Sequence, residues 1–311
     1  MATTHTYPSD RVHFTWDAGN EPVLAVADGD SVEIETRDVS DGQVTSDSTA
    51  DVIATLDWGR VYPLAGPIRV DDAEPGDTLA VEILELETRG WGWTAVIPGL
   101  GLLPDDFPDP YLRTFDLTTG DVTYLREDIA IPVAPFLGTM GVCPAGATQQ
   151  AVMPPGTFGG NMDTRHLTRG TTLYLPVQVE GALFSCGDAH AAQGDGEVCV
   201  TGIETPMGVT LRLTLQKGRR IPAPQFETAG PLTRAVDGSG FYGTTGVGPD
   251  LYAAAQDAVR AMIDHVAGTY DLSREDAYVL ASLVVDLKIA EIVDAGVYVV
   301  SALLPLAVFR R

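Results

Sequence analysis

The stretch from residue 184 to residue 204 gathers the side-chain types that acid/base or metal chemistry requires. Its sequence, FSCGDAHAAQGDGEVCVTGIE, places one histidine and several acids among glycines and alanines. A packed core does not need such residues, because a buried charge is costly unless it is paired. In an extended chain Asp188 and His190 project from the same face, which is the geometry for two ligands of one metal ion. The pattern therefore indicates an active site, with a hydrogen-bonded surface pair as the alternative.

Further acids in this stretch strengthen the interpretation. Asp195, Glu197 and Glu204 offer more oxygen ligands or a general base, and small residues surround them. A site of mixed nitrogen and oxygen donors suits Zn²⁺ or a similar divalent ion, and an oxygen-rich one could hold Ca²⁺. The neighbours therefore favour a divalent metal bound by Asp188 and His190, with the other acids as further ligands or as a general base.

A second candidate segment is MPPGTFGGNMDTRHL, residues 153–167, which contains Gly159, Gly160, Asn161 and Asp163. Gly-Gly-Asn is an unusual way to continue a strand. One interpretation is a tight turn. The other is a cradle of backbone N–H groups beside a carboxylate, facing a substrate oxygen.

Other catalytic chemistries lack their residues. Cys143, Cys186 and Cys199 have no C-x-x-C spacing, and the acids that follow Cys186 would raise the pKa of its thiol rather than lower it. There is no G-x-S-x-G, and neither Lys217 nor Lys288 stands in a Gly/Ser-rich stretch. A phosphate-binding G-x-x-x-x-G-K-[ST] loop is also missing. Metal and carboxylate chemistry remains.

The elements that must position these residues are mainly strands. Residues 23–38 alternate around a Gly-Asp turn, and residues 66–87 place Leu79, Val81 and Ile83 on one face after the turn Glu-Pro-Gly-Asp. Further strands are expected at 124–133, 172–179 and 209–216. Residues 39–62 and 91–110 are expected to be long loops, the first of them either surface or functional.

Helices are predicted only near the C-terminus. Apolar residues at helical spacing follow Asp250, a plausible N-cap, and a second helix is expected to begin at Ser273, before two strands joined by a turn. The fold class is therefore α+β with β dominant. We expect a single unit over 1–311, mainly β over 1–222, with a helix-containing subregion over 223–311 packed on it.

Composition excludes several kinds of partner. The formal net charge is −24 and only two residues are lysine, so a nucleic-acid partner is not expected. The acids are spread along the chain, which is typical of the solvated surface of halophilic, salt-adapted proteins. The N-terminus does not resemble a signal peptide and no apolar run is long enough to span a membrane, so we expect a cytoplasmic protein with no membrane partner.

Several long strings resemble one known family. GALFSCGDAHAAQGDGEVCVTGIE is similar to the signature of the acetamidase/formamidase family, and PPGTFGGNMDTRHLTRGTTLYLPV resembles the segment that precedes it. GPIRVDDAEPGDTLAVEI, GTMGVCPAG and the C-terminal helices and strands resemble further segments, in the family's order along the whole chain. Two positions depart from the pattern, Tyr62 and Cys143, and both bear on the shape of the pocket.

The resemblance implies a β-sandwich or barrel core, a homo-oligomer, and hydrolysis of short linear amides such as formamide or acetamide to a carboxylate and ammonia. Combined with the residues, it implies a metal-activated water, with Glu197 or Glu204 as the general base. Backbone groups near Gly160 and Asn161 are expected to bind the substrate and stabilise the oxyanion. Asp163 and Gln193 are expected to orient the substrate or the metal ligands. Asp195 and Asp38 are expected to be additional metal ligands. Asp163 is also expected to be catalytic.

Two other functions stay open on the sequence. The protein could hydrolyse a larger or cyclic amide, as a lactamase does, or it could be a non-catalytic metal- or ligand-binding β protein. Release of ammonia from formamide, acetamide or propionamide, with and without a chelator, distinguishes these possibilities.

Overall fold

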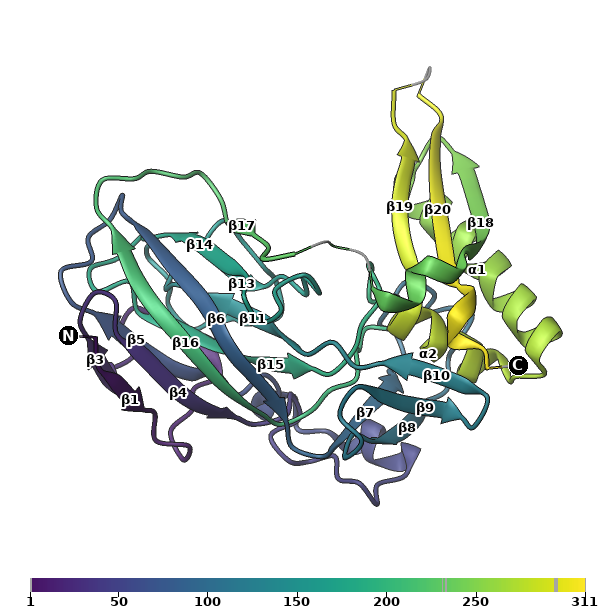
Figure 1. Ribbon diagram of the computed structural model, residues 1–311, viewed down its shortest axis with the longest axis horizontal. Coiled ribbons are helices and arrows are strands. Elements are labelled where there is room, and N and C mark those ends of the chain that lie inside the picture. The colour runs from purple at the N-terminus through teal and green to yellow at the C-terminus, as the bar shows by residue number, and fades with distance from the viewer. Residues whose placement is uncertain (1, 231, 233, 294–295, 311) are drawn as a thin grey trace.

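The protein is described by a computed structural model that covers residues 2–310, apart from 231, 233, 294 and 295. Strands dominate and two α-helices lie near the C-terminus of the described chain (Figure 1). The α+β class with dominant β structure is therefore confirmed.

The first layer of a β-sandwich is a six-stranded sheet. Its interior strands alternate buried and exposed residues, as in β4, where Val32, Ile34 and Thr36 are buried and the two glutamates between them are exposed. This alternation puts one face of the sheet on the core. The strand order is β1 (Thr4–Thr6), β4 (Ser31–Thr36), β16 (Met207–Gln216), β6 (Thr78–Thr88), β14 (Thr172–Pro176) and β17 (Gln225–Glu227).

The second layer is a five-stranded sheet whose inner strands are buried on both faces. Every residue of β11 and β15 is buried. The order is β13 (Gly159–Asn161), β11 (Phe136–Gly141), β15 (Phe184–His190), β5 (Ala65–Val70) and β3 (Leu24–Val26). Apolar side chains of both sheets form one continuous core. The strands expected within residues 66–87 are β5 and β6, and they lie in different sheets, so the turn between them crosses from one layer to the other.

Three strand pairs lie outside the two large sheets. They are β7 (Trp91–Val96) with β8 (Tyr111–Asp116), β9 (Val122–Arg126) with β10 (Ile129–Pro132), and β2 (Thr15–Trp16) with β12 (Gln150–Ala151). The expectation of a loop over 91–110 is wrong for its first residues, since β7 is a buried strand. Glycines and aromatic residues obscured the strand signal there, and pairing with β8 decides it.

The C-terminal region packs on a second core. Helices α1 (Leu251–Tyr270) and α2 (Arg274–Val284) begin at the predicted caps, because Asp250 accepts a hydrogen bond from the Ala253 N–H and Ser273 accepts one from the Asp276 N–H. Their apolar faces bury against side chains of β8, β9, β10 and residues 191–203. Short 3₁₀-helices complete the described elements at Ala50–Thr55, Trp58–Arg60, Ala235–Ser239 and Leu306–Val308.

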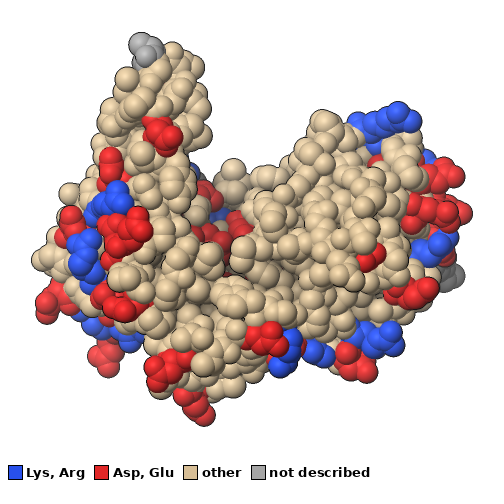
Figure 2. Space-filling view, turned by 180° about the vertical axis from the view of Figure 1, so that it is seen from behind, with Lys and Arg blue, Asp and Glu red and all other residues tan. Residues whose placement is uncertain are grey.

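A three-stranded sheet forms an arm that rises beside the sandwich (Figure 1). Its order is β18 (Phe241–Gly248), β20 (Tyr298–Pro305) and β19 (Asp286–Glu291), and α1 packs against it. The turn expected between the last two strands falls partly on residues 294 and 295, outside the described residues. Figure 2 shows a hollow between the arm and the rest of the molecule, with acidic side chains at its base. In the described part of the chain, no helix is long and apolar enough to cross a membrane.

Candidate active site

Four carboxylates surround one buried histidine where the sandwich meets the second core. Ala189 packs in the sandwich core and Ala191 in the second core, so the end of β15 passes from one to the other. His190, which lies between them, is 1% exposed. Its Nε2 atom lies 3.4 Å from Asp188 Oδ1, 3.1 Å from Glu204 Oε2 and 3.9 Å from Glu197 Oε1.

Within the described part of the chain, two groups of three residues could hold a metal ion, and both include His190. They are Asp163, His190 and Glu197, and Asp188, His190 and Glu204. In each group the candidate ligand atoms lie within 4.8 Å of one another. The structure thus brings together five of the residues singled out from the sequence.

Different elements deliver these side chains. Asp188 and His190 come from β15, Asp163 follows β13, and Glu204 is held by a bridge to β7, in which Glu204 N and Trp93 O lie 2.7 Å apart. Gly138 of β11 lies directly beneath the carboxylates. A Cβ atom there would approach Asp163 Oδ1 to 2.5 Å and Asp188 Oδ2 to 2.8 Å. Only a glycine permits this close approach of the backbone at residue 138.

Gln193 sets the tautomer of His190. Its amide NH₂ donates to the Asp163 carbonyl at 2.8 Å, and a carbonyl can only accept. The Gln193 Oε1 atom therefore faces His190 Nδ1, 2.8 Å away, and Nδ1 carries the proton. This leaves the Nε2 atom to face the carboxylates, as a metal ligand requires.

The crowding of acids shifts their pKa values. Burial, followed by the charge of Asp188, raises the pKa of Asp163 to about 7. Burial also raises the pKa of Glu204 to about 7, although His190 opposes this. Burial and then Asp163 raise the pKa of Glu197 well above its usual range. For His190 burial alone would lower the pKa, but Glu204 and Asp188 outweigh it and hold the pKa well above the ordinary value.

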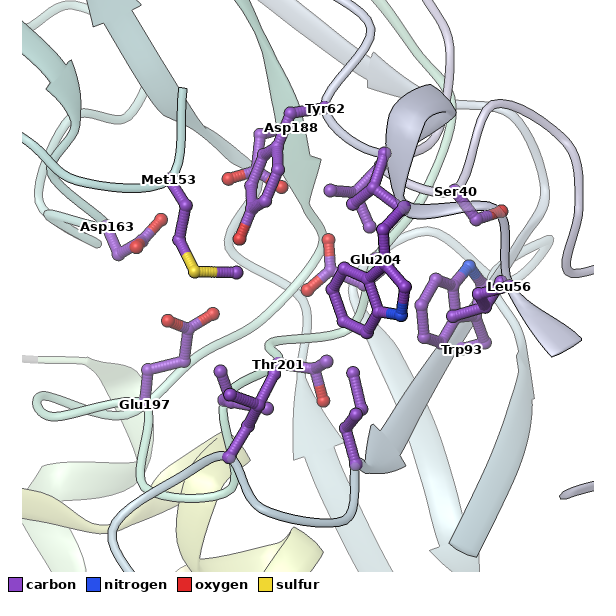
Figure 3. Close-up of a pocket in the computed structure, with 16 residues that line it drawn as sticks. Ser40, Leu56, Tyr62, Trp93, Met153, Asp163, Asp188, Glu197, Thr201 and Glu204 are labelled. Carbon is purple, nitrogen blue, oxygen red and sulfur yellow. The ribbon is translucent and has the colours of Figure 1, made fainter. Parts of the chain in front are cut away.

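The carboxylates open onto a small cavity with one polar and one apolar side (Figure 3). The cavity has a volume of about 30 Å³, enough for about two or three waters. Its polar side is formed by the carboxylates. The other side is lined by Val39, Ser40, Leu56, Trp58, Val61, Tyr62, Trp93, Ile97, Leu100, Met153, Val200 and Thr201.

Two residues expected as metal ligands lie elsewhere. Asp195 pairs with Arg165 at 2.9 Å and belongs to neither candidate metal group, because Arg165 draws it toward Asp286 at the base of the arm. Asp38 accepts hydrogen bonds from Ser40 and from the Gly42 N–H, and so shapes the loop behind the cavity instead. Neither residue therefore lies in a candidate metal group of the described residues.

The Gly-Gly-Asn segment also lies outside the cavity lining. Gly160 and Asn161 belong to β13, which pairs with β11, and neither is among the residues that line the cavity. Asn161 accepts from Thr139 and donates to Asp163 Oδ2 at 3.0 Å. It therefore orients a carboxylate rather than contacting the space where substrate would lie. Gln193 acts in the same way, through His190 and the Asp163 carbonyl.

The sequence alone pointed to few of the residues that form the apolar side of the cavity. Residues 39–62 supply much of it, although only their length pointed to function. Trp93 lies in the segment expected to be a loop. The three cysteines are buried, and burial raises the pKa of Cys186 to about 12 and that of Cys143 to about 11, so neither thiol is a nucleophile at neutral pH.

Comparison with known proteins finds one family that matches nearly the whole chain. The acetamidase/formamidase family matches residues 3–152 and 145–311. An acetamidase of Mycolicibacterium smegmatis is 30% identical over 286 residues, covering 72% of this chain and 69% of that protein. A formamidase of Methylophilus methylotrophus is 28% identical over 246 residues, covering 62% and 60%.

Solved structures agree with these matches. The crystal structure of an acetamidase from Bacillus halodurans is 32% identical, with a TM-score of 0.69, and the match covers 97% of each chain. A gamma lactamase from Delftia acidovorans has a TM-score of 0.91 over 98% of this chain and 93% of its own, and at 24% identity it shows a shared fold. Because the family match extends over nearly every residue, the chain belongs to the acetamidase/formamidase family.

Proposed function

We propose that this protein is an amidohydrolase that cleaves the C–N bond of short linear amides, of the formamide and acetamide type, to a carboxylate and ammonia. The observation that carries the proposal is the carboxylate–histidine cluster opening onto a cavity with room for only a few heavy atoms. Family membership supports the reaction class, since the relatives are an acetamidase and a formamidase.

A divalent metal ion fits the residues present. Asp188, His190 and Glu204 would hold it, because Gln193 contacts the Nδ1 atom of His190 and leaves Nε2 facing the carboxylates, where an ion would replace the proton that these acids otherwise favour. Glu204 Oε2 is also buried without a hydrogen-bond partner among the described residues. One imidazole nitrogen with carboxylate oxygens suits Zn²⁺, and a more oxygen-rich set could take Ca²⁺. Such an ion supplies Lewis-acid polarisation of a carbonyl and acidifies water.

Glu197 is the general base in this proposal. Its side chain is 17% exposed, against 3% for Glu204, so it can exchange protons with solvent more readily. Glu204 is instead fixed by the Gly202 N–H, which donates to its Oε1 atom at 3.0 Å. As water adds to the amide carbon, Glu197 takes one of its protons and passes it to the nitrogen. The C–N bond then breaks and ammonia leaves.

Two variants separate the roles. Glu197→Gln should release ammonia from acetamide at least about 100-fold more slowly than the wild type, with its metal content unchanged. Glu204→Gln should lose both metal and activity, because it replaces an anionic carboxylate ligand with a neutral amide. Ammonia assays with and without a chelator, together with metal analysis, make the comparison. Wild-type turnover in Glu197→Gln, or in fully chelated protein, would contradict the assignment.

We also propose that the protein is a homo-oligomer. Exposed apolar side chains on the arm support this, since Val247 and Ile289 are each 59% exposed. Light scattering of the purified protein tests it, and a monomer at micromolar concentration would reject it. The cytoplasmic location stays a prediction from the sequence.

A further inference from the structure

Tyr62 stands where the two sides of the cavity meet. It lines the cavity beside the carboxylates, and its ring packs with the apolar side chains of residues 39–62 and with the edge of the sandwich core. In Figure 3 the phenol oxygen points into the cavity, toward the space between Met153 and Glu204, and the Asp188 carboxylate lies behind the ring. The chain thus places a hydroxyl group in the cavity that the acidic cluster lines.

The backbone holds Tyr62 in an uncommon conformation. Its φ angle is 64°, in the left-handed region, which is a rare position for an aromatic residue. The Tyr62 N–H donates to the Val39 carbonyl at 2.9 Å, so the two ends of the loop are closed on each other. Strain of this kind persists where the surroundings enforce it, and it often accompanies a functional role.

The Tyr62 hydroxyl is available to a ligand. Tyr62 is half-buried, and among the described residues no side chain or backbone group forms a hydrogen bond with its hydroxyl. The carboxylates nearby could accept a hydrogen bond but lie beyond hydrogen-bond reach. The Tyr62 hydroxyl is therefore free to donate a hydrogen bond to a small ligand in the cavity.

We propose that Tyr62 contacts the substrate and determines specificity: its hydroxyl donates a hydrogen bond to the amide oxygen, and its ring limits the length of the acyl group. This inference rests on the proposed amide hydrolysis. The cavity orients the amide, because the acyl end gains by lying on the wall that contains Leu56 and Trp93, while the nitrogen faces Glu197. The carbonyl oxygen then lies between them, under Tyr62.

Removal of the hydroxyl and removal of the ring give different results. Tyr62→Phe keeps the ring and should lower kcat/KM for acetamide by about 10- to 100-fold, without changing the preference among amides. Tyr62→Ala opens the cavity and should raise the ratio of kcat/KM for butyramide over that for acetamide by about tenfold or more. Tyr124→Phe, which removes an exposed hydroxyl on β9, should match the wild type in both measurements.

Either of two results overturns the proposal: wild-type kcat/KM in Tyr62→Phe, or an unchanged substrate ratio in Tyr62→Ala. If the wild type releases ammonia from no amide, the proposed function fails, and calorimetry with acetamide then decides the role of Tyr62. A weaker Kd for acetamide in Tyr62→Phe than in the wild type supports the contact. An equal Kd, or no binding to either protein, rejects it.

Discussion

Gly138 shows how closely the backbone approaches the acidic cluster. A single methyl group at this position would lie within 3 Å of Asp163 and Asp188 oxygens, on a buried strand that cannot easily shift. We predict that Gly138→Ala lowers kcat for acetamide by about 100-fold or more, because the carboxylates must move by an ångström or so.

The matched control is Gly268→Ala in α1, where a Cβ would meet nothing within 4 Å. This change should leave activity intact and raise the free energy of unfolding by about 0.5–1 kcal/mol, because alanine favours the helix. Steady-state kinetics and thermal unfolding measure both variants. Full activity in Gly138→Ala would show that the carboxylates do not need their observed places.

Gln193 acts on His190 without lining the main cavity. It accepts the Nδ1 proton of His190 and donates to the Asp163 carbonyl, so its loss frees the imidazole to take the other tautomer. We predict that Gln193→Leu weakens binding of the divalent metal by about 10- to 100-fold. Competition with a chelating dye measures this affinity, and an unchanged affinity would reject the positioning role.

At the scale of elements, Asp77 ties the start of β6 to the end of β16. Its carboxylate accepts from Lys217 Nζ at 2.8 Å, from the Gly218 N–H at 2.7 Å and from the Glu74 N–H at 2.9 Å. Burial alone would raise its pKa, but Lys217 and these two N–H groups outweigh it and lower the pKa of Asp77. The ionised form of Asp77 therefore stabilises this junction between β6 and β16.

The sign of this effect predicts a pH dependence. The stabilisation is present above the pKa of an unfolded aspartate, about 4, and is lost as the pH falls through the lowered folded pKa. Asp77→Asn should therefore cost about 1–3 kcal/mol at pH 7 and progressively less in acid. Urea unfolding across this range tests it. Asp71→Asn, whose side chain is 55% exposed, should change little, and a cost for Asp77→Asn that is independent of pH would contradict the prediction.

At the scale of the whole molecule, charge is strongly unbalanced. The chain has 43 acidic and 19 basic residues, and in Figure 2 acidic side chains are spread over the visible face. Like charges at this density repel one another, and salt at about 1 M shortens the screening length to about 3 Å. We predict that the Tm at pH 7 rises with NaCl from low to molar concentration.

The control uses the same protein near its isoelectric point, about pH 4.3, where the net charge vanishes. There the same salt series should change the Tm much less. A Tm at pH 7 that does not depend on NaCl would show that repulsion contributes little to the stability of this fold.

The sequence by itself determined the features that depend on near neighbours. The alternation of Val32, Ile34 and Thr36 predicts the buried face of β4, and Ser273 with Asp276 predicts the start of α2. Asp188 and His190 share a face because the side-chain period of a strand is two. These signals are local, since each is set by backbone geometry over a few residues.

Only the tertiary structure decided which acids meet and which do not. Asp195 is only seven residues from Asp188, yet it pairs with Arg165 outside the acidic cluster. Glu204 contacts His190 because its backbone pairs with β7. Tyr62 and Trp93 come to the cavity from segments about a hundred residues or more distant from Asp188. Such contacts depend on how sheets and loops pack, and no periodicity along the chain encodes them.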